Sequence, residues 1–180
     1  MASITQSDVT LPAVVVMGVA GSGKSVVASA LAATLGARFV EGDILHPPEN
    51  VARMASGLPL TDIDRKGWLD TIGSEIAAAA SRGESVVAAC SSLKRAYRER
   101  LRQHWGRISF VYLDIDPETA RQRVSMRKGH FMPASLVESQ FADLEPPAAD
   151  ENALTLDGSH PVAELVEASS EFLRVNRTIR

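Results

Sequence analysis

One short segment of the chain has a composition suited to holding a phosphorylated ligand. It reads Gly18-Val19-Ala20-Gly21-Ser22-Gly23-Lys24-Ser25, which matches the pattern G-x-x-x-x-G-K-S. Glycines allow successive backbone N–H groups to converge on an anion, and the positive end of a following helix adds to that attraction. We therefore predict a nucleoside triphosphate site. Its residues are Gly18, Ala20, Gly21, Ser22, Gly23, Lys24, Ser25 and Val26.

Two side chains at the end of this segment have distinct chemical roles. Lys24 can reach the terminal phosphates of a nucleotide, and Ser25 can offer its hydroxyl to Mg²⁺. The alternative is a glycine-rich turn that binds nothing. An apolar run before the segment and helical residues after it favour the nucleotide site.

A second group of polar residues follows the predicted strand at 38–41. Ligands of parallel sheets sit beyond the carboxyl ends of the strands, so Asp43 is expected beside the phosphate-binding segment. There it can orient or deprotonate a substrate hydroxyl, or hold water on Mg²⁺; its alternative role is a turn or helix cap. His46, fixed by the two prolines after it, is either a hydrogen-bonding partner of the substrate or a structural histidine.

Three cations are candidate contacts for an anionic substrate. Arg53 and Arg65 lie in an insertion at about 44–66, and Lys94 follows the third predicted strand. A guanidinium holds a carboxylate through two parallel hydrogen bonds. The alternative is a set of surface ion pairs and helix caps. Most of the basic run between 94 and 102 is interpreted as a solvated helix face, with Ser91 and Ser92 as candidate caps for that helix.

A third basic group lies near the middle of the second half. Arg123 and Arg127 are four residues apart, so they share a helix face, and Lys128-Gly129-His130 then breaks the helix. We interpret residues 127–136 as a lid that closes over the nucleotide and brings positive charge to the transferred phosphoryl group. The alternative is an exposed basic helix end.

Hydrophobic patterning places these residues on an α/β framework. Apolar strand-like runs alternate with helical stretches, which is typical of a parallel sheet with helices on both faces. The expected strands are 13–17, 38–41, 85–89, 108–113 and 153–156. The expected helices are 24–35, 48–56, 65–81, 93–104, 117–127, 134–143 and 161–175.

Composition sets the broad class of the protein. The 180 residues are 45% hydrophobic, which suits one domain over 13–180 behind a flexible N-terminus at 1–12. A net charge of −3 argues against nucleic-acid binding, and no apolar run is long enough to span a membrane. The single Cys90 is expected to be buried packing, and with the absence of a secretory signal it predicts a cytoplasmic protein.

Four segments together resemble the small, phosphate-loop gluconokinases. They are G-V-A-G-S-G-K-S, G-D-I-L-H-P-P-E-N-V-A-R-M-A-S-G-L-P-L-T-D-I-D-R-K-G-W-L, C-S-S-L-K-R-A-Y-R and R-K-G-H-F-M-P-A-S-L-V-E-S-Q-F-A-D-L-E-P-P. The phosphate-binding segment alone is unspecific, but the combination is highly specific and covers about Val14 to Pro147. The chain departs at Arg53, where the family often has lysine, and at Ile63, where a further aspartate is common.

The resemblance implies ATP-dependent, Mg²⁺-assisted phosphorylation of D-gluconate at its 6-hydroxyl by a homodimer with a fold like nucleoside monophosphate and shikimate kinases. It implies catalytic roles for Lys24, Asp43, Arg123 and Arg127, and acceptor contacts from Asp43, His46, Arg53, Arg65, Lys94 and His130. Alternatives are a kinase for another acceptor, a GTPase switch and a silent nucleotide-binding protein. The absence of an Asn-Lys-x-Asp segment argues against the switch.

Overall fold

The computed structural model describes residues 13–126, 133 and 135–178. Its centre is a parallel sheet of five strands in the order β2-β3-β1-β4-β5. The strands are β1 (Ala13–Met17), β2 (Arg38–Glu41), β3 (Val86–Ala89), β4 (Ile108–Asp114) and β5 (Ala153–Asp157). The expected sheet is confirmed. The predicted N-terminal segment 1–12, Arg127 and His130 lie outside the described residues.

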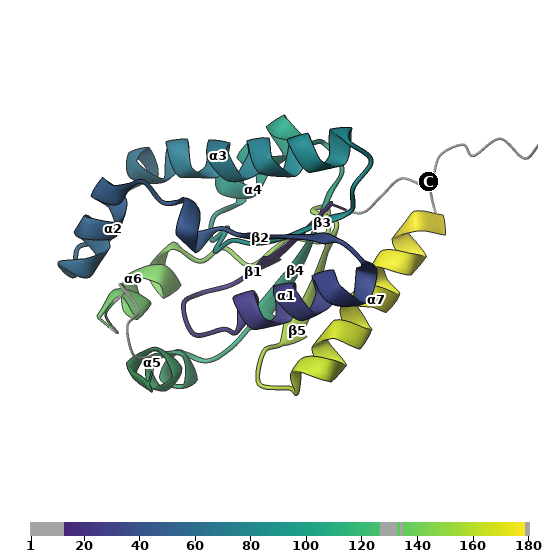
Figure 1. Cartoon of the computed structure of the whole chain (residues 1–180). Coiled ribbons are helices and arrows are strands. Elements are labelled where there is room, and N and C mark those ends of the chain that lie inside the picture. Colours follow the sequence, from purple (N-terminus) through teal and green to yellow (C-terminus); the bar gives the residue numbers. More distant parts are fainter. Residues whose placement is uncertain (1–12, 127–132, 134, 179–180) are drawn as a thin grey trace, which may run out of the picture.

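Helices cover both faces of this sheet (Figure 1). They are α1 (Lys24–Leu35), α2 (Pro48–Ala55), α3 (Asp62–Ser81), α4 (Arg95–His104), α5 (Pro117–Met126), α6 (Leu136–Asp143) and α7 (Val162–Thr178), with a 3₁₀ turn η1 (Asp43–Leu45). Helices α1 and α7 pack on one face, and α3 and α4 on the other. The shorter α2, α5 and α6 gather at the carboxyl end of the strands, where the predicted site residues lie.

Alternation along β1 explains the two cores. Val14 and Val16 point to the core under α1 and α7, whereas Val15 and Met17 point to the core under α3 and α4. All of these side chains are fully buried, as expected for a central strand of a parallel sheet. This rigid central strand fixes the point from which the phosphate-binding segment leaves the sheet.

Four helices begin at other residues than the pattern predicted: α3, α4, α6, which begins at Leu136 rather than at 134, and α7, which begins at Val162 rather than at 161. Helix α3 begins at Asp62 rather than Arg65 because the Thr61 hydroxyl and the Asp64 carboxylate form a reciprocal capping box. Helix α4 begins at Arg95 rather than Leu93, since Ser92 has φ +45° and Leu93 is buried. Neither Ser91 nor Ser92 caps α4, so that expectation was wrong.

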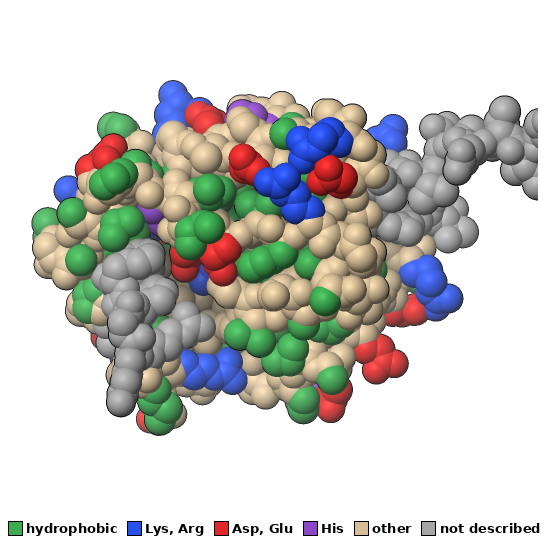
Figure 2. Space-filling view, viewed as in Figure 1, with side chains coloured by type: hydrophobic (Ala, Val, Ile, Leu, Met, Phe, Trp, Pro, Cys, Tyr) green, Lys and Arg blue, Asp and Glu red, His purple; other side chains and the backbone are tan. Residues whose placement is uncertain are grey.

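Charge is mixed over the visible surface. Figure 2 shows Lys and Arg side chains interspersed with Asp and Glu on this face, with small hydrophobic groups between them. Among the helices that the structure describes, none is long and apolar enough to cross a membrane.

Candidate functional site

The phosphate-binding segment forms a tight loop between β1 and α1. Gly21 has φ +84°, and a Cβ there would lie 2.7 Å from the Ala120 carbonyl oxygen, so only glycine fits. Gly23 has φ +91° and precedes α1, which begins at Lys24. The loop therefore ends at the amino terminus of a helix of 12 residues, where backbone N–H groups and the helix dipole favour an anion.

Lys24 and Arg123 both lie against this loop. The Lys24 side chain is 7% exposed, and its Nζ lies 3.5 Å from the Val19 carbonyl oxygen. Arg123 Nη1, from α5, donates to the carbonyls of Gly21 at 3.3 Å and Gly158 at 3.1 Å. Two of the predicted cations thus meet at the loop although 99 residues separate them in sequence.

The hydroxyls of the loop are differently placed. Ser22 is 1% exposed, and its Oγ makes no hydrogen bond within the described part of the chain. Ser25 lies in the first turn of α1 and is half-buried. The Ala20 N–H, in contrast, donates to the Gln140 side chain at 2.7 Å. In this structure the Ala20 amide is therefore directed to α6 rather than to a ligand.

After β2, η1 carries Asp43 and leads to His46. The His46 ring stacks on Trp68, with centroids 4.0 Å apart, and the Trp68 indole N–H donates to the Gly42 carbonyl at 2.7 Å. Trp68 is 1% exposed, as expected of a core residue. Burial is the main cause that lowers the pKa of His46 to about 4. The charge of Asp43 opposes this shift, and the charges of Arg65 and Lys24 add to it. His46 therefore stays neutral at physiological pH.

Arg65 and Lys94 meet in one ionic cluster. Lys94 Nζ lies 2.8 Å from an Asp62 carboxylate oxygen and 3.3 Å from one of Asp143, and Arg65 lies 3.8 Å from Asp143. The Tyr97 hydroxyl also donates to Asp62. Hydrogen bonding to Asp62 raises the pKa of Lys94 and, after burial, is the second cause that raises the pKa of Tyr97 to about 12. The cluster brings α3, α4 and α6 together.

Arg65 and Arg53 differ in how their N–H groups are used. Arg65 is 5% exposed, and its Nε is buried without a hydrogen-bond partner among the described residues. A buried donor of this kind is costly unless a ligand accepts from it. Arg53 is about 40% exposed in its side chain and donates from Nε to the Pro59 carbonyl at 2.9 Å, 3.5 Å from the Asp64 carboxylate. Arg65 therefore has a buried Nε–H without a partner among the described residues, whereas the Nε–H of Arg53 is used within the chain.

Cys90 lies at the end of β3 and is fully buried. Burial raises the pKa of its thiol to about 11. The thiol is therefore neutral, which agrees with the prediction of packing rather than nucleophilic chemistry.

The prediction of a solvated basic helix face on α4 was wrong at Arg98. Its side chain is fully buried and pairs with Glu151 through two hydrogen bonds of 2.7 and 2.8 Å. Arg98 also donates to the carbonyls of Ser92, Leu93 and Glu145. Arg98 therefore ties the β3–α4 connection, which carries Lys94, to the segment before β5.

A cavity of about 360 Å³ adjoins the phosphate loop. Its walls come from the loop, α1, α5 and the β5–α7 connection; they are Gly21, Ser22, Gly23, Val26, Val27, Arg123, Met126, Gly158, His160, Val162 and Leu165. Sequence reasoning placed Val26 and Arg123 here but missed Gly158, His160 and Val162. Their position could have been predicted, because residues that follow the carboxyl end of a strand in a parallel sheet commonly line the ligand site, and these three follow β5.

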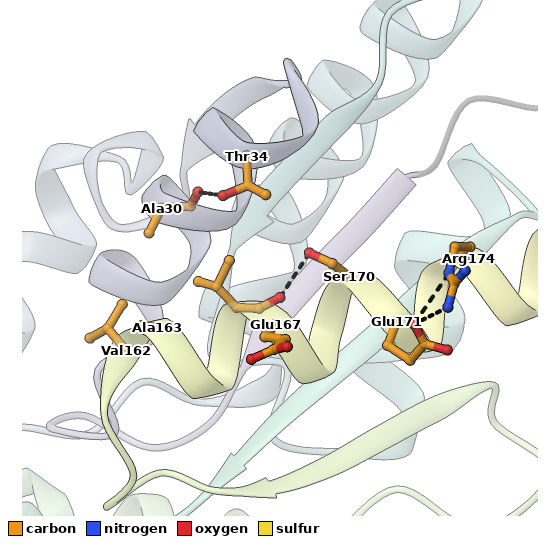
Figure 3. Close-up of a pocket in the computed structure, with 9 residues that line it drawn as sticks. Ala30, Thr34, Val162, Ala163, Glu167, Ser170, Glu171 and Arg174 are labelled. Carbon is orange, nitrogen blue, oxygen red and sulfur yellow. Dashed lines mark hydrogen bonds and ion pairs between the residues drawn. The ribbon is translucent and has the colours of Figure 1, made fainter.

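A wider groove of about 710 Å³ lies between α1 and α7 (Figure 3). The hydroxyls of Thr34 and Ser170 donate to carbonyls of their own helices, and Glu171 pairs with Arg174. These polar groups are used within the helices that form the groove. The predicted phosphate-binding residues lie at the loop between β1 and α1 instead, so we look for the chemistry there.

The sheet order and the glycine-rich loop between β1 and α1 define a phosphate-loop nucleoside triphosphate-binding protein of the kinase type. The family model described as AAA domain matches residues 14–147. A gluconokinase from Gluconobacter oxydans is 46% identical over 88% of this chain and 89% of its own length.

Solved structures agree with this similarity. A crystal structure of a gluconokinase from Sinorhizobium meliloti superposes with a TM-score of 0.82 at 43% identity, over 94% of this chain and 96% of that one. A sugar kinase from Janibacter gives a TM-score of 0.87 at 43% identity, over 94% and 98% of the two chains. The chain belongs to the gluconokinase family, and as a phosphate-loop kinase it binds ATP.

Proposed function

We propose that this protein transfers the γ-phosphoryl group of ATP to the 6-hydroxyl of D-gluconate. The observation that carries the proposal is the pairing of two sites at one edge of the sheet: a phosphate loop and a cationic cluster made by the buried Arg65 and the partly exposed Lys94. Gluconate offers a carboxylate and a row of hydroxyls, which suit a guanidinium, an ammonium and a neutral imidazole. The relatives named gluconokinases support the choice of acceptor.

In this mechanism the chain positions the reactants and neutralises charge, since phosphoryl transfer needs little covalent help. Lys24 and Arg123, both at the phosphate loop, stabilise the γ-phosphoryl group, and Arg127 joins them from the proposed lid at 127–136. Asp43 orients the attacking hydroxyl. His46, Arg53, Arg65, Lys94 and His130 hold the acceptor. The empty hydrogen-bonding capacity of the Arg65 Nε supports its part in this set.

Mg²⁺ fits the same loop. The described residues contain no group of three acidic, histidine or cysteine side chains that could hold a metal by themselves. Mg²⁺ commonly keeps several waters and takes only one or two protein oxygens beside the substrate phosphates. Ser25 and, through water, Asp43 would hold the ion, which supplies charge neutralisation at the phosphates.

The direct test is a coupled assay of ADP release with ATP and Mg²⁺. Release should depend on D-gluconate and not on shikimate or nucleoside monophosphates. Release stimulated only by another acceptor would leave the fold and nucleotide site intact but remove the assignment of gluconate. No release with any acceptor, despite nucleotide binding, would favour a silent binding protein.

Replacing Arg65 with methionine should raise KM for gluconate about tenfold or more, which corresponds to about 1.4 kcal/mol. The expected cause is loss of the buried N–H donor facing the acceptor, so KM for ATP should stay within about twofold. Steady-state kinetics with each substrate varied in turn measures both values. Arg53→Met is the matched control: its smaller expected effect follows from the Pro59 and Asp64 contacts of Arg53. An unchanged KM in Arg65→Met would remove Arg65 from the acceptor site.

Titration of His46 gives a second, independent check of the site. Its pKa of about 4 lies below the value of 6.5 in an unfolded chain, so the unfolded state binds the proton first as pH falls. The His46 contribution to stability is therefore complete above pH 6.5 and declines towards pH 4. NMR should show the His46 resonance titrating near pH 4, with His46→Asn assigning the signal. A midpoint near 6.5 would contradict a buried, neutral ring.

We further propose a homodimer in the cytoplasm, with residues 13–180 as one kinase domain and the acceptor insertion at about 44–66. The resemblance to the small gluconokinases supports the dimer, and the single buried Cys90 suits a reducing compartment. Sedimentation velocity should give twice the chain mass of 19.3 kDa; a single species at 19.3 kDa would contradict the dimer.

A further inference from the structure

One residue outside the predicted site contacts the phosphate loop directly. The Gln140 Oε1, on α6, accepts the Ala20 N–H at 2.7 Å. Gln140 is 5% exposed and Ala20 4%, so this hydrogen bond is shielded from water although 120 residues separate its partners. Removing one partner of such a buried bond leaves the other unsatisfied, which is costly. The bond therefore fixes the orientation of the loop at Ala20.

The same helix reaches the acceptor side of the site. Asp143 lies three residues after Gln140, a spacing that puts the two side chains on neighbouring turns of one face. Its carboxylate lies 3.3 Å from Lys94 Nζ and 3.8 Å from the Arg65 guanidinium. Helix α6 thus has a side chain on the nucleotide loop and another on the acceptor cations, with an axial separation of roughly 4.5 Å between the two residues.

The carboxyl end of α6 is fixed to the β3–α4 connection. The Glu145 carboxylate accepts the Arg95 N–H at 2.7 Å, and the Glu145 N–H donates to the Leu93 carbonyl at 2.8 Å. Arg98, fully buried, donates to the Glu145 carbonyl at 3.0 Å. The helix also buries Val137 in the core. A shift of α6 would therefore move Lys94 and the phosphate loop together.

We propose that α6 is a strut that couples the two substrate sites, with Gln140 as the positioning residue at the phosphate loop and Asp143 at the acceptor cations. The identity of the acceptor rests on the proposed function. Because α6 contacts both sites, a ligand that shifts this helix at one site also moves the residues of the other. Nucleotide and acceptor should consequently strengthen each other's binding, and by linkage the factor is the same in both directions.

Calorimetric titration tests the strut without turnover. The dissociation constant of a non-hydrolysable ATP analogue with Mg²⁺ is measured with and without saturating gluconate. In the unmodified protein we expect gluconate to tighten analogue binding at least about fivefold, the lower end of common coupling factors. In Gln140→Met, which keeps the side-chain length but loses the acceptor oxygen, the ratio should fall to near one.

Controls separate coupling from general damage. Ser139→Ala alters the neighbouring position of α6, whose hydroxyl donates only to the Leu136 carbonyl of the same helix among the bonds described, and should keep the full ratio. Asp143→Asn changes α6 at the acceptor cations and should also lower the ratio of the two dissociation constants. This variant keeps the proposal testable if Gln140→Met does not fold. Thermal melting of each variant shows which ones are folded.

Two results would overturn the strut: a ratio near one in the unmodified protein, or an unchanged ratio in both folded variants. Failure of the proposed function looks different. In that case the ADP-release assay shows no dependence on gluconate, and the same titrations with the acceptor that supports release decide whether α6 couples the sites.

Discussion

Replacing Lys24 with methionine is expected to lower kcat about a thousandfold, or roughly 4 kcal/mol of transition-state stabilisation, without unfolding the protein. Lys24 is 7% exposed at the first position of α1, and its ammonium contacts the Val19 carbonyl of the loop itself. Charge on the transferred phosphoryl group must be balanced at this point, and methionine fills similar volume without the charge. The fold should persist because the lost contact is a single hydrogen bond.

The measurement is kcat by coupled ADP release, with thermal melting as the control for folding. Lys66→Met removes a lysine from the exposed surface of α3 and should leave kcat within about twofold. Direct titration with the ATP analogue shows whether the remaining loop still binds nucleotide. A Lys24→Met protein that retained more than a tenth of the normal kcat would contradict the proposed role of this lysine.

Local sequence was enough to predict the glycine-rich loop between β1 and α1. The phosphate loop is a continuous segment, and the conformations at Gly21 and Gly23 follow from residue type and spacing. The five strands were predictable because each is a short apolar run bounded by turns. Glycine also marked the end of α1, where Gly36 has φ +60°.

The connections that hold the site together were not predictable in the same way. Gln140 carries no sign in its own segment that it bonds to Ala20, 120 residues earlier. Arg98 lies in a run of basic residues that looks uniformly solvated, yet its partner Glu151 comes 53 residues later. Such pairings depend on the packing of whole elements, so a pattern read along one helix cannot show them.

Two further features had a local sequence pattern, but the pattern was not used fully: the start of α3 and the difference between Arg65 and Arg53. Thr61 and Asp64 have the three-residue spacing of a capping box, and this spacing alone would have moved the start of α3 back to Asp62. Residue type alone proposes Arg53 and Arg65 equally as acceptor contacts, and only the burial seen in the structure distinguishes them.

The largest expected loss of stability comes from Arg98→Met. This variant leaves the Glu151 carboxylate, 1% exposed, without its main partner, and breaking one side of a buried pair costs about 3–5 kcal/mol. For a chain of this size that corresponds to a fall in Tm of about 10 °C. The pairing also lowers the pKa of Glu151 to about 2, so its stabilisation is complete above pH 4.5 and is lost as pH falls towards 2.

Two further variants distinguish this pair from ordinary surface charge. Arg95→Met breaks ion pairs with Glu99 and Asp150 on the exposed side of the same helix, and should change Tm far less than Arg98→Met, because water and salt screen exposed ion pairs. Arg98→Met combined with Glu151→Gln removes both charges and should recover part of the lost Tm. Recovery stays incomplete because the carbonyls of Ser92, Leu93 and Glu145 still lack their donor. Equal losses from Arg95→Met and Arg98→Met would show that burial of the Arg98–Glu151 pair does not control stability here.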